Sequence, residues 1–286
     1  SFTVDELAKK RVGQTVGDRY ELQRLLGIGS CGAVYEAWHR YTHKSVALKA
    51  MHPHLTAEPE AVSRFFREAR AAAAIGHSAI PDVLDAGLLE GGRPYIVHQL
   101  LEGRALDEVI AEGVLPPGEV RLIGIGLLGA LAAAHDVSIV HRDVKPENIF
   151  LARAKDGFDV RLLDFGVAKN LQSTDPSGVL TKPGTALGTP SYMAPEQARG
   201  NPVDGRADVW GAGASLFHAL TGEVPFDAPS LPMLLMKIVT TRPPSVRDKN
   251  PRVARELADA IDRALEPELD KRWPDARSMM RALEPS

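Results

Sequence analysis

Three glycines in the segment LLGIGSCGAVYEAWH, residues 25–39, have the spacing of a phosphate-binding turn. Gly27, Gly29 and Gly32 form the pattern GxGxxG. Residues without a Cβ let the backbone close around a phosphate chain, and two unrelated nucleotide-binding architectures use this pattern. One architecture binds a dinucleotide cofactor, and the other uses a triphosphate as its substrate. The flanking residues indicate which of the two is present.

The residues after the glycines favour a triphosphate. A dinucleotide fold needs a helix directly after the glycine turn and an acidic residue about 20 positions later for the ribose. Here residues 33–38 alternate in a way that predicts a strand, and the basic Lys49 stands where the acid would be expected. A glycine hairpin between two strands, backed by a lysine on a third strand, is expected to cover a triphosphate.

The elements that must position these residues fall into two parts. From Tyr20 to about Val97 the sequence predicts strands at 20–27, 32–40 and 44–52, a helix within 57–76, and a hairpin turned by Gly91-Gly92. Beyond residue 104 the pattern becomes mainly helical, with a long apolar helix near 120–137 and a strand pair within 148–166. The sequence therefore predicts a sheet-rich lobe followed by a larger helical lobe.

Three further motifs follow in the second part: HRDVKPENIF at 141–150, LDFG at 163–166 and GTPSYMAPEQ at 188–197. With the glycines and VALK at 46–49, they make the chain resemble the protein kinase family over about residues 18–285. Within that family it is similar to the eukaryotic-like (Hanks-type) serine/threonine kinases of bacteria. The resemblance implies transfer of the γ-phosphate of ATP to Ser/Thr hydroxyls of proteins, with autophosphorylation and a part in signal transduction.

The resemblance also implies an α+β fold of two lobes with a nucleotide cleft between them. The smaller lobe would hold a five-stranded antiparallel sheet plus one helix, and the larger lobe would be mainly helical. The implied divisions are an N-terminal extension at 1–17, an N-lobe at 18–98, a hinge at 99–104, a C-lobe at 105–286 and an activation segment at 164–196.

Five residues are implied to carry the transfer. Lys49 would hold the α- and β-phosphates and be fixed by Glu68 on the small-lobe helix. Asp143 would accept or orient the proton of the substrate hydroxyl, and Lys145 would neutralise the γ-phosphate. Thr189 resembles the threonine that hydrogen-bonds both Asp143 and Lys145 in this family.

ATP and Mg²⁺, with Mn²⁺ as an alternative metal, are the implied cofactors. Asn148 and Asp164 match the two metal ligands of the family, and oxygen donors suit such a hard cation. Ordinary core packing is the alternative role for the apolar members of the nucleotide site. Besides Lys49, the implied nucleotide-binding residues are Gly27, Ile28, Gly29, Gly32, Val34, Ala47, Gln99, Leu101 and Phe150.

Supporting residues are implied as well. Glu196 is expected to pair with Arg272, and Asp208 to hold the backbone of the catalytic loop. His141 and Phe165 are expected to stack.

Regulation by phosphorylation is implied by Arg142, which directly precedes Asp143. A phosphate on the activation segment would pair with this guanidinium and order the segment. Thr185 is the first candidate site and Thr181 the second.

Several residues depart from the family pattern or compete for another role. Cys31 stands at the tip of the glycine loop as a small residue or a reactive thiol, and His98 stands behind the adenine site as a core histidine or a polar gate. His52 and His54 lack the companions of a metal site, and an exposed loop is predicted for both.

Composition limits the partners. The net charge of −3 gives no electrostatic attraction for nucleic acid, and the single cysteine excludes an internal disulfide. Protein substrates and a homodimer of kinase domains are the expected partners, with no membrane contact from this segment. The chain begins at Ser1, so we expect a piece of a longer, cytoplasmic protein, or of a membrane-anchored protein whose kinase domain faces the cytosol.

Two other functions compete with the protein kinase. A pseudokinase scaffold would bind nucleotide or a partner without transfer, but such proteins usually lack at least one of the residues present here. They are Lys49, Glu68, Asp143, Asn148 and Asp164. A small-molecule kinase of the antibiotic-modifying type shares the architecture but lacks the APE segment at 194–196.

Overall fold

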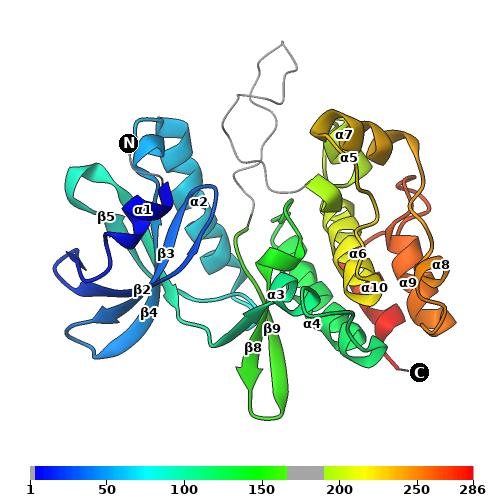
Figure 1. Cartoon of the computed structure of the whole chain (residues 1–286), viewed down its shortest axis with the longest axis horizontal. Helices are drawn as coiled ribbons and strands as arrows, with labels where there is room; N and C mark the ends of the chain where they lie inside the picture. Colours follow the sequence, from blue (N-terminus) through cyan, green and yellow to red (C-terminus); the bar gives the residue numbers. More distant parts are fainter. Residues whose placement is uncertain (1–3, 166–189, 286) are drawn as a thin grey trace. The chain divides into compact units, whose positions relative to one another are not determined.

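The computed structural model describes residues 4–165 and 190–285, which form two compact units (Figure 1). Among the described residues, the N-terminal unit comprises 4–76 and 81–102. The C-terminal unit comprises 77–80, 103–165 and 190–285. Each unit has its own sheet and its own buried core.

The N-terminal unit is built on an antiparallel sheet with strand order β1-β2-β3-β4-β6-β5. Two α-helices, α1 (Val4–Lys9) and α2 (Pro59–Ile75), and two short 3₁₀ turns, Pro53–Leu55 and Glu90–Gly92, complete it. The strands are β1 (Thr15–Val16), β2 (Tyr20–Ile28), β3 (Gly32–His39), β4 (Lys44–Met51), β5 (Val83–Leu88) and β6 (Pro94–Gln99).

The two faces of this sheet are used differently, because successive side chains of a strand point to opposite sides. One face carries a core built around Tyr35, Leu48 and Val97, which are fully buried. On the other face, Met51 and Ile96 pack with residues of α2. The residues that alternate with the first core therefore lie on the side that α2 covers.

The sheet has one strand more than the predicted five-stranded sheet. The extra strand is β1, where Thr15 pairs with Glu21 and Val16 with Tyr20. The preceding α1 joins the same core: Ala8 is buried, and its carbonyl accepts a 3.0 Å hydrogen bond from the Tyr35 hydroxyl. Both elements lie in the predicted extension at 1–17, so residues 4–16 pack as part of this unit and add a second helix to it.

The C-terminal unit combines a small antiparallel sheet, β7-β8-β9, with helices. Its strands are β7 (Gly103–Ala105), β8 (Ile149–Ala154) and β9 (Gly157–Leu162). The helices are α3 (Leu106–Ile110), α4 (Pro117–Asp136), α5 (Pro195–Ala198), α6 (Gly205–Thr221), α7 (Leu231–Thr240), α8 (Val246–Lys249), α9 (Arg255–Ala264) and α10 (Ala276–Leu283), with 3₁₀ turns at Pro146–Asn148 and Pro190–Tyr192.

Helix α4 is the central helix of this unit. It packs against α6, α10 and β9, and Ile123, Leu127 and Leu131 are fully buried. Its length and apolar composition would also suit a membrane span, and half of that apolar stretch is buried. Contacts on several sides explain an apolar helix inside a folded core.

A buried ion pair joins two distant segments of the C-terminal unit, as the sequence predicts. The Glu196 carboxylate in α5 accepts two hydrogen bonds from the Arg272 guanidinium, at 2.7 and 3.1 Å. The Arg272 side chain is 0% exposed and also donates to the backbone oxygens of Glu266 and Arg206. Nearly all of its donors are therefore satisfied, which a buried guanidinium requires.

Replacing this arginine should destabilise the C-terminal unit strongly. In Arg272→Ala the Glu196 carboxylate would stay buried without its partner, and breaking such a pair costs about 3–5 kcal/mol. Urea unfolding followed by circular dichroism measures the loss. Arg242→Ala is the control, because Arg242 pairs with Glu266 and Glu268 in contact with solvent and should matter much less. Equal losses of unfolding free energy in the two variants would contradict a stabilising role for the buried Glu196–Arg272 pair.

Candidate active site

Lys49 and Glu68 form a buried ion pair inside the N-terminal unit. The ammonium of Lys49 in β4 lies 2.7 Å from the Glu68 Oε1 atom in α2, and the two side chains are 8% and 10% exposed. A single charge at this depth would be costly, so each group needs the other. The pairing predicted from the sequence is present, and it fixes the position of the amine on the α2 side of the sheet.

Two of the predicted nucleotide-binding residues lie on that same side. Val34 is the cross-strand neighbour of Lys49, and Ala47 precedes Lys49 by two residues on β4, so the alternation of the strands places all three on one face. Val34 and Ala47 are only half-buried. This face therefore offers accessible apolar surface beside a buried cation.

The remaining predicted nucleotide-binding residues are divided between the units. Gln99 ends β6 and its N–H donates to the Asp82 oxygen at 3.1 Å, while Leu101 follows outside any strand. Phe150 belongs to the C-terminal unit, where it lies in β8 opposite Ala105 and Arg161. All three are at least partly accessible.

The glycine loop connects β2 to β3. The Gly29 N–H donates to the Gly32 oxygen at 2.9 Å, which closes the turn, and Gly27 and Ile28 still pair with Val34 and Ala33 of β3. A Cβ on Gly32 would overlap the backbone of Ala50 in β4. Glycine is required there by the close approach of a neighbouring strand.

His52 holds this loop from the end of β4, a contact that the sequence did not predict. Its Nε2 atom lies 2.7 Å from the Gly29 oxygen, and its backbone N–H donates to the Cys31 oxygen at 2.9 Å. The carbonyl can only accept, so Nε2 carries the proton. The predicted exposure of both loop histidines is wrong for His52, which is 4% exposed, and correct for His54.

In the C-terminal unit, Asp143, Lys145 and Asn148 are brought together. The Lys145 ammonium lies 3.4 Å from the Asp143 Oδ2 atom, and the Asn148 amide donates to the Asp143 backbone oxygen at 2.8 Å. Asn148 is buried, whereas the side chains of Asp143 and Lys145 are 24% and 16% exposed. A carboxylate and an ammonium are thus held together at the surface, where a substrate group can reach both.

Asp164 is tied to this cluster through the β8–β9 hairpin. Asn148 directly precedes β8 and Leu163 directly follows β9, and the Leu163 N–H donates to the Asn148 oxygen at 2.8 Å. Asp164 is the next residue, is exposed and has a left-handed backbone with φ of 49°. Asn148 and Asp164 therefore both lie at the open end of this hairpin, just before β8 and just after β9.

This pair of oxygen donors fits Mg²⁺. The Asn148 amide nitrogen donates to the Asp143 backbone oxygen, so the amide oxygen of Asn148 and the carboxylate of Asp164 are the two candidate ligand groups. Mg²⁺ is usually held by one or two carboxylates, with water and phosphate oxygens completing its shell. Within residues 4–165 and 190–285, no group of three or more His, Cys, Asp and Glu side chains is arranged to hold a metal alone.

Asp208 of α6 fixes the backbone of the catalytic loop, as the sequence predicts. Its carboxylate accepts from the N–H groups of His141 and Arg142, at 2.8 and 2.7 Å, and lies 2.7 Å from the His135 Nε2 atom. Asp208 is 1% exposed, so these donors compensate a charge withdrawn from water.

His141 connects the loop that contains Asp143 to the β8–β9 hairpin. Its Nε2–H donates to the Leu163 oxygen at 2.9 Å, and its Nδ1 accepts from the Asp143 N–H at 3.2 Å. The His141 ring also lies 4.7 Å from the ring of Phe165, the contact expected from the sequence. Asp143 and Asp164 are therefore positioned from the same imidazole.

Thr181, Thr185 and Thr189 lie outside the described residues. Their predicted partner Arg142 is described: it has a left-handed backbone with φ of 66°, and its carbonyl accepts from the Gln197 amide at 2.9 Å.

Comparison with known proteins gives one consistent family. The family model for the protein kinase domain matches residues 20–283. The chain is 37% identical to serine/threonine-protein kinase pkn3 of Myxococcus xanthus over 258 residues, covering 89% of this chain and 47% of pkn3. It is 35% identical to serine/threonine-protein kinase PknB of Mycobacterium tuberculosis, covering 92% of this chain and 42% of PknB. The chain thus spans less than half the length of these relatives.

A solved structure supports the same fold. The crystal structure of the Mycobacterium tuberculosis PknI kinase domain is similar with a TM-score of 0.73 and 31% sequence identity, covering 95% of this chain and 96% of that one.

Removing the His52 ring should loosen the glycine loop. His52→Ala deletes the bond to the Gly29 oxygen, and a hydrogen bond of this kind contributes about 1 kcal/mol, or about fivefold in an opening equilibrium. Hydrogen–deuterium exchange of residues 27–32 should therefore become about fivefold faster. His54→Ala, which removes the neighbouring stacked ring, should leave that exchange unchanged, and acceleration in both variants would refute the anchoring role.

Proposed function

Because the chain belongs to the protein kinase family, we propose that it transfers the γ-phosphate of ATP to serine and threonine hydroxyls of proteins. The observation that carries the proposal is the cluster of Asp143, Lys145 and Asn148, held in place by Asp208. A module that only binds nucleotide has no need of an accessible carboxylate paired with an ammonium.

The chemistry assigned to this cluster follows from the transition state. Phosphoryl transfer passes through a loose transition state, so catalysis consists mainly of positioning and charge stabilisation. Asp143 orients the substrate hydroxyl and receives its proton as the oxygen bonds to the γ-phosphorus, while the bond from that phosphorus to the bridging oxygen breaks and ADP leaves. Lys145, 3.4 Å from that carboxylate, offsets the charge of the transferred group.

In the N-terminal unit, the buried amine is assigned to the nucleotide. Lys49 binds the α- and β-phosphates, and Glu68 holds the amine in the position required for that contact. The loop containing Gly27, Ile28, Gly29 and Gly32 covers the phosphate chain with its backbone.

The adenine base is assigned to apolar residues and to backbone groups. Val34 and Ala47 contact one side of the ring, and Phe150 the other. The backbone near Gln99 and Leu101 binds the adenine edge; since the Gln99 N–H is donated to Asp82, Leu101 is the candidate donor.

Asn148 and Asp164 would hold Mg²⁺, with Mn²⁺ as an alternative. When bound, the metal supplies positive charge that offsets the charge of the phosphate oxygens. Both residues lie at the open end of the β8–β9 hairpin, from where they would hold the metal.

Phosphorylation of the activation segment, 164–196, is proposed as the control. Thr185 is the first candidate and Thr181 the second, with Arg142 as the guanidinium that would pair with the phosphate. Thr189 is assigned to hydrogen bonds with Asp143 and Lys145. Mass spectrometry of active protein in which neither Thr185 nor Thr181 is modified would reject these two sites.

The whole protein would act on protein substrates in signal transduction. We assign the chain to the cytosol, with residues 99–104 as the hinge between an N-lobe at 18–98 and a C-lobe at 105–286. A homodimer of kinase domains is a further proposal. Membrane anchoring through a part of the protein outside this chain would be compatible with a kinase domain in the cytosol.

Loss of the Asp143 carboxylate should abolish transfer while nucleotide binding persists. General-base catalysis contributes about 10²- to 10⁴-fold, so Asp143→Asn should lower incorporation of label from ATP by at least about 100-fold. Autophosphorylation with radiolabelled ATP and Mg²⁺ measures this, and a fluorescent nucleotide measures binding. Asp156→Asn, in the exposed turn between β8 and β9, is the matched control. No incorporation by the parent chain, with nucleotide still bound, would indicate a scaffold.

Neutralising Glu68 should impair the same reaction less severely. Glu68→Gln keeps the shape of the side chain but removes the charge that pairs with Lys49, and a hydrogen bond to a charged group contributes about 1.5–3 kcal/mol. The expected fall in kcat/KM is about 10- to 100-fold. Glu60→Gln changes an exposed carboxylate of the same helix and should leave kcat/KM within twofold of the parent. Similar effects of the two substitutions would contradict the role of the pair.

A further inference from the structure

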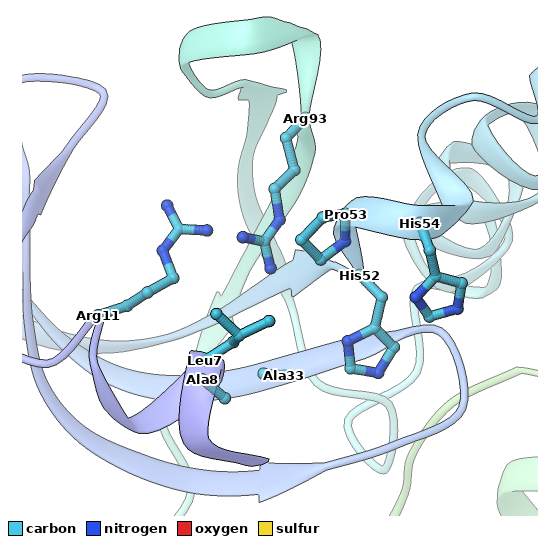
Figure 2. A pocket seen from close by; sticks show the side chains of 8 residues that line it. All are labelled: Leu7, Ala8, Arg11, Ala33, His52, Pro53, His54 and Arg93. Atoms are coloured by element: carbon cyan, nitrogen blue, oxygen red, sulfur yellow. The ribbon is translucent and has the colours of Figure 1, made fainter. Parts of the chain in front are cut away.

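A cationic cavity of about 140 Å³ lies within the N-terminal unit (Figure 2). Four of its lining side chains are basic: Arg11, His52, His54 and Arg93. The other lining residues are apolar and come from α1, from β3 and from the segment after β4. The lining contains no carboxylate.

The two guanidinium groups have no acidic partner among the described residues. Arg93 donates through Nε to the backbone oxygen of Met51, a neutral acceptor. The Arg11 side chain makes no hydrogen bond or ion pair with any described residue, although it is only half exposed. In Figure 2 the Arg93 side chain reaches toward Leu7 and Pro53, and the Arg11 guanidinium is turned to the side of Arg93. Two uncompensated cations beside one cavity repel each other, and an anion between them would remove that repulsion.

The donors and the volume fit a phosphate group. Guanidinium groups present N–H donors in a planar fork that matches phosphate oxygens in a bidentate manner. A water molecule takes up about 30 Å³ in the liquid, so the cavity holds the equivalent of four or five waters, close to the five heavy atoms of phosphate. Leu7, Ala8 and Pro53 add apolar contacts that an inorganic ion would not use.

We propose that this cavity binds a phosphate monoester, with Arg11 and Arg93 on the phosphate oxygens and the apolar lining on the carbon that carries the ester. Two sources offer this chemistry: a phosphorylated serine or threonine side chain of a polypeptide, and a small phosphorylated metabolite.

The cavity is connected to the glycine loop by His52. The same imidazole that lines the cavity bonds to the Gly29 oxygen, and it stacks on His54 with ring centroids 5.6 Å apart. A bound ester therefore restricts His52 to the rotamer that holds the loop closed. Nucleotide binding to that loop should be strengthened by the ester, and by linkage the nucleotide should strengthen binding of the ester equally. This coupling rests on the proposed function, whereas binding of the ester does not.

Calorimetric titration of the chain tests the binding. The probes are acetyl-Ala-phosphoSer-Ala-amide, the same peptide without phosphate, glycerol 3-phosphate and inorganic phosphate, at constant ionic strength, with and without the ATP analogue AMP-PNP. AMP-PNP prevents the probes from occupying the nucleotide site. We expect saturable binding of at least one ester, weakened at least tenfold in Arg11→Gln. Arg40→Gln, which alters an exposed arginine of the same unit, should change the affinity less than twofold.

Comparing the probes identifies the source of the ester and shows which results would reject the site. Tighter binding of the phosphopeptide identifies a polypeptide source, and tighter binding of glycerol 3-phosphate identifies a metabolite. No saturable binding of either ester, equal affinity for inorganic phosphate, or equal effects of the two arginine substitutions would overturn the site. The Arg11 side chain makes no hydrogen bond or ion pair with a described residue, so Arg11→Gln should fold normally, and an unchanged melting temperature excludes misfolding as the cause.

The affinity for AMP-PNP tests the coupling. It should rise at least threefold when the ester is saturating, and this rise should vanish in His52→Ala. Ester binding without any change in AMP-PNP affinity would overturn the coupling alone. Absence of AMP-PNP binding under every condition would count against the proposed function and leave the ester site standing.

Discussion

A charged side chain withdrawn from water is tolerated only where other groups compensate its charge, and both units are arranged around such compensation. In the N-terminal unit, Lys49 and Glu68 join the sheet to α2. In the C-terminal unit, Glu196 and Arg272 join α5 to the segment between α9 and α10. Each pair links segments that are separated in sequence. Burying either charge without its partner would carry a large desolvation penalty, so each unit is stable only when both segments are in place.

The same requirement for charge compensation fixes the loop that contains Asp143, through Asp208. Its buried carboxylate needs donors, and the N–H groups of His141 and Arg142 supply them. Those bonds fix the backbone immediately before Asp143. Because His141 in turn bonds to Leu163, the residue before Asp164, one buried charge positions a catalytic candidate and a metal-ligand candidate together. The hydrogen bonds that the buried Asp208 carboxylate requires therefore fix the backbone on which these residues are placed.

The sequence predicted these features to different extents. The ion pairs and the Asp208 anchor were implied by the resemblance of the motifs to the protein kinase family, and the strands around Lys49 follow from alternation. Strand β1 could not be predicted, since two residues carry no periodic signal and its pairing depends on β2. The burial of His52 depends on a backbone oxygen of Gly29, 23 positions away, which no local pattern encodes.

The glycine loop is anchored by contacts that its own sequence does not contain. Residues 26–30 are exposed, so side-chain burial contributes little to their position. The loop is held instead by hydrogen bonds to its backbone: Gly29 to Gly32, and two from His52, one from its imidazole and one from its N–H. Each such bond contributes about 1 kcal/mol, which is enough to favour one conformation and too little to prevent opening. A loop that must admit and release a nucleotide needs stability in this range, and a side chain at its base is therefore well placed to tune it.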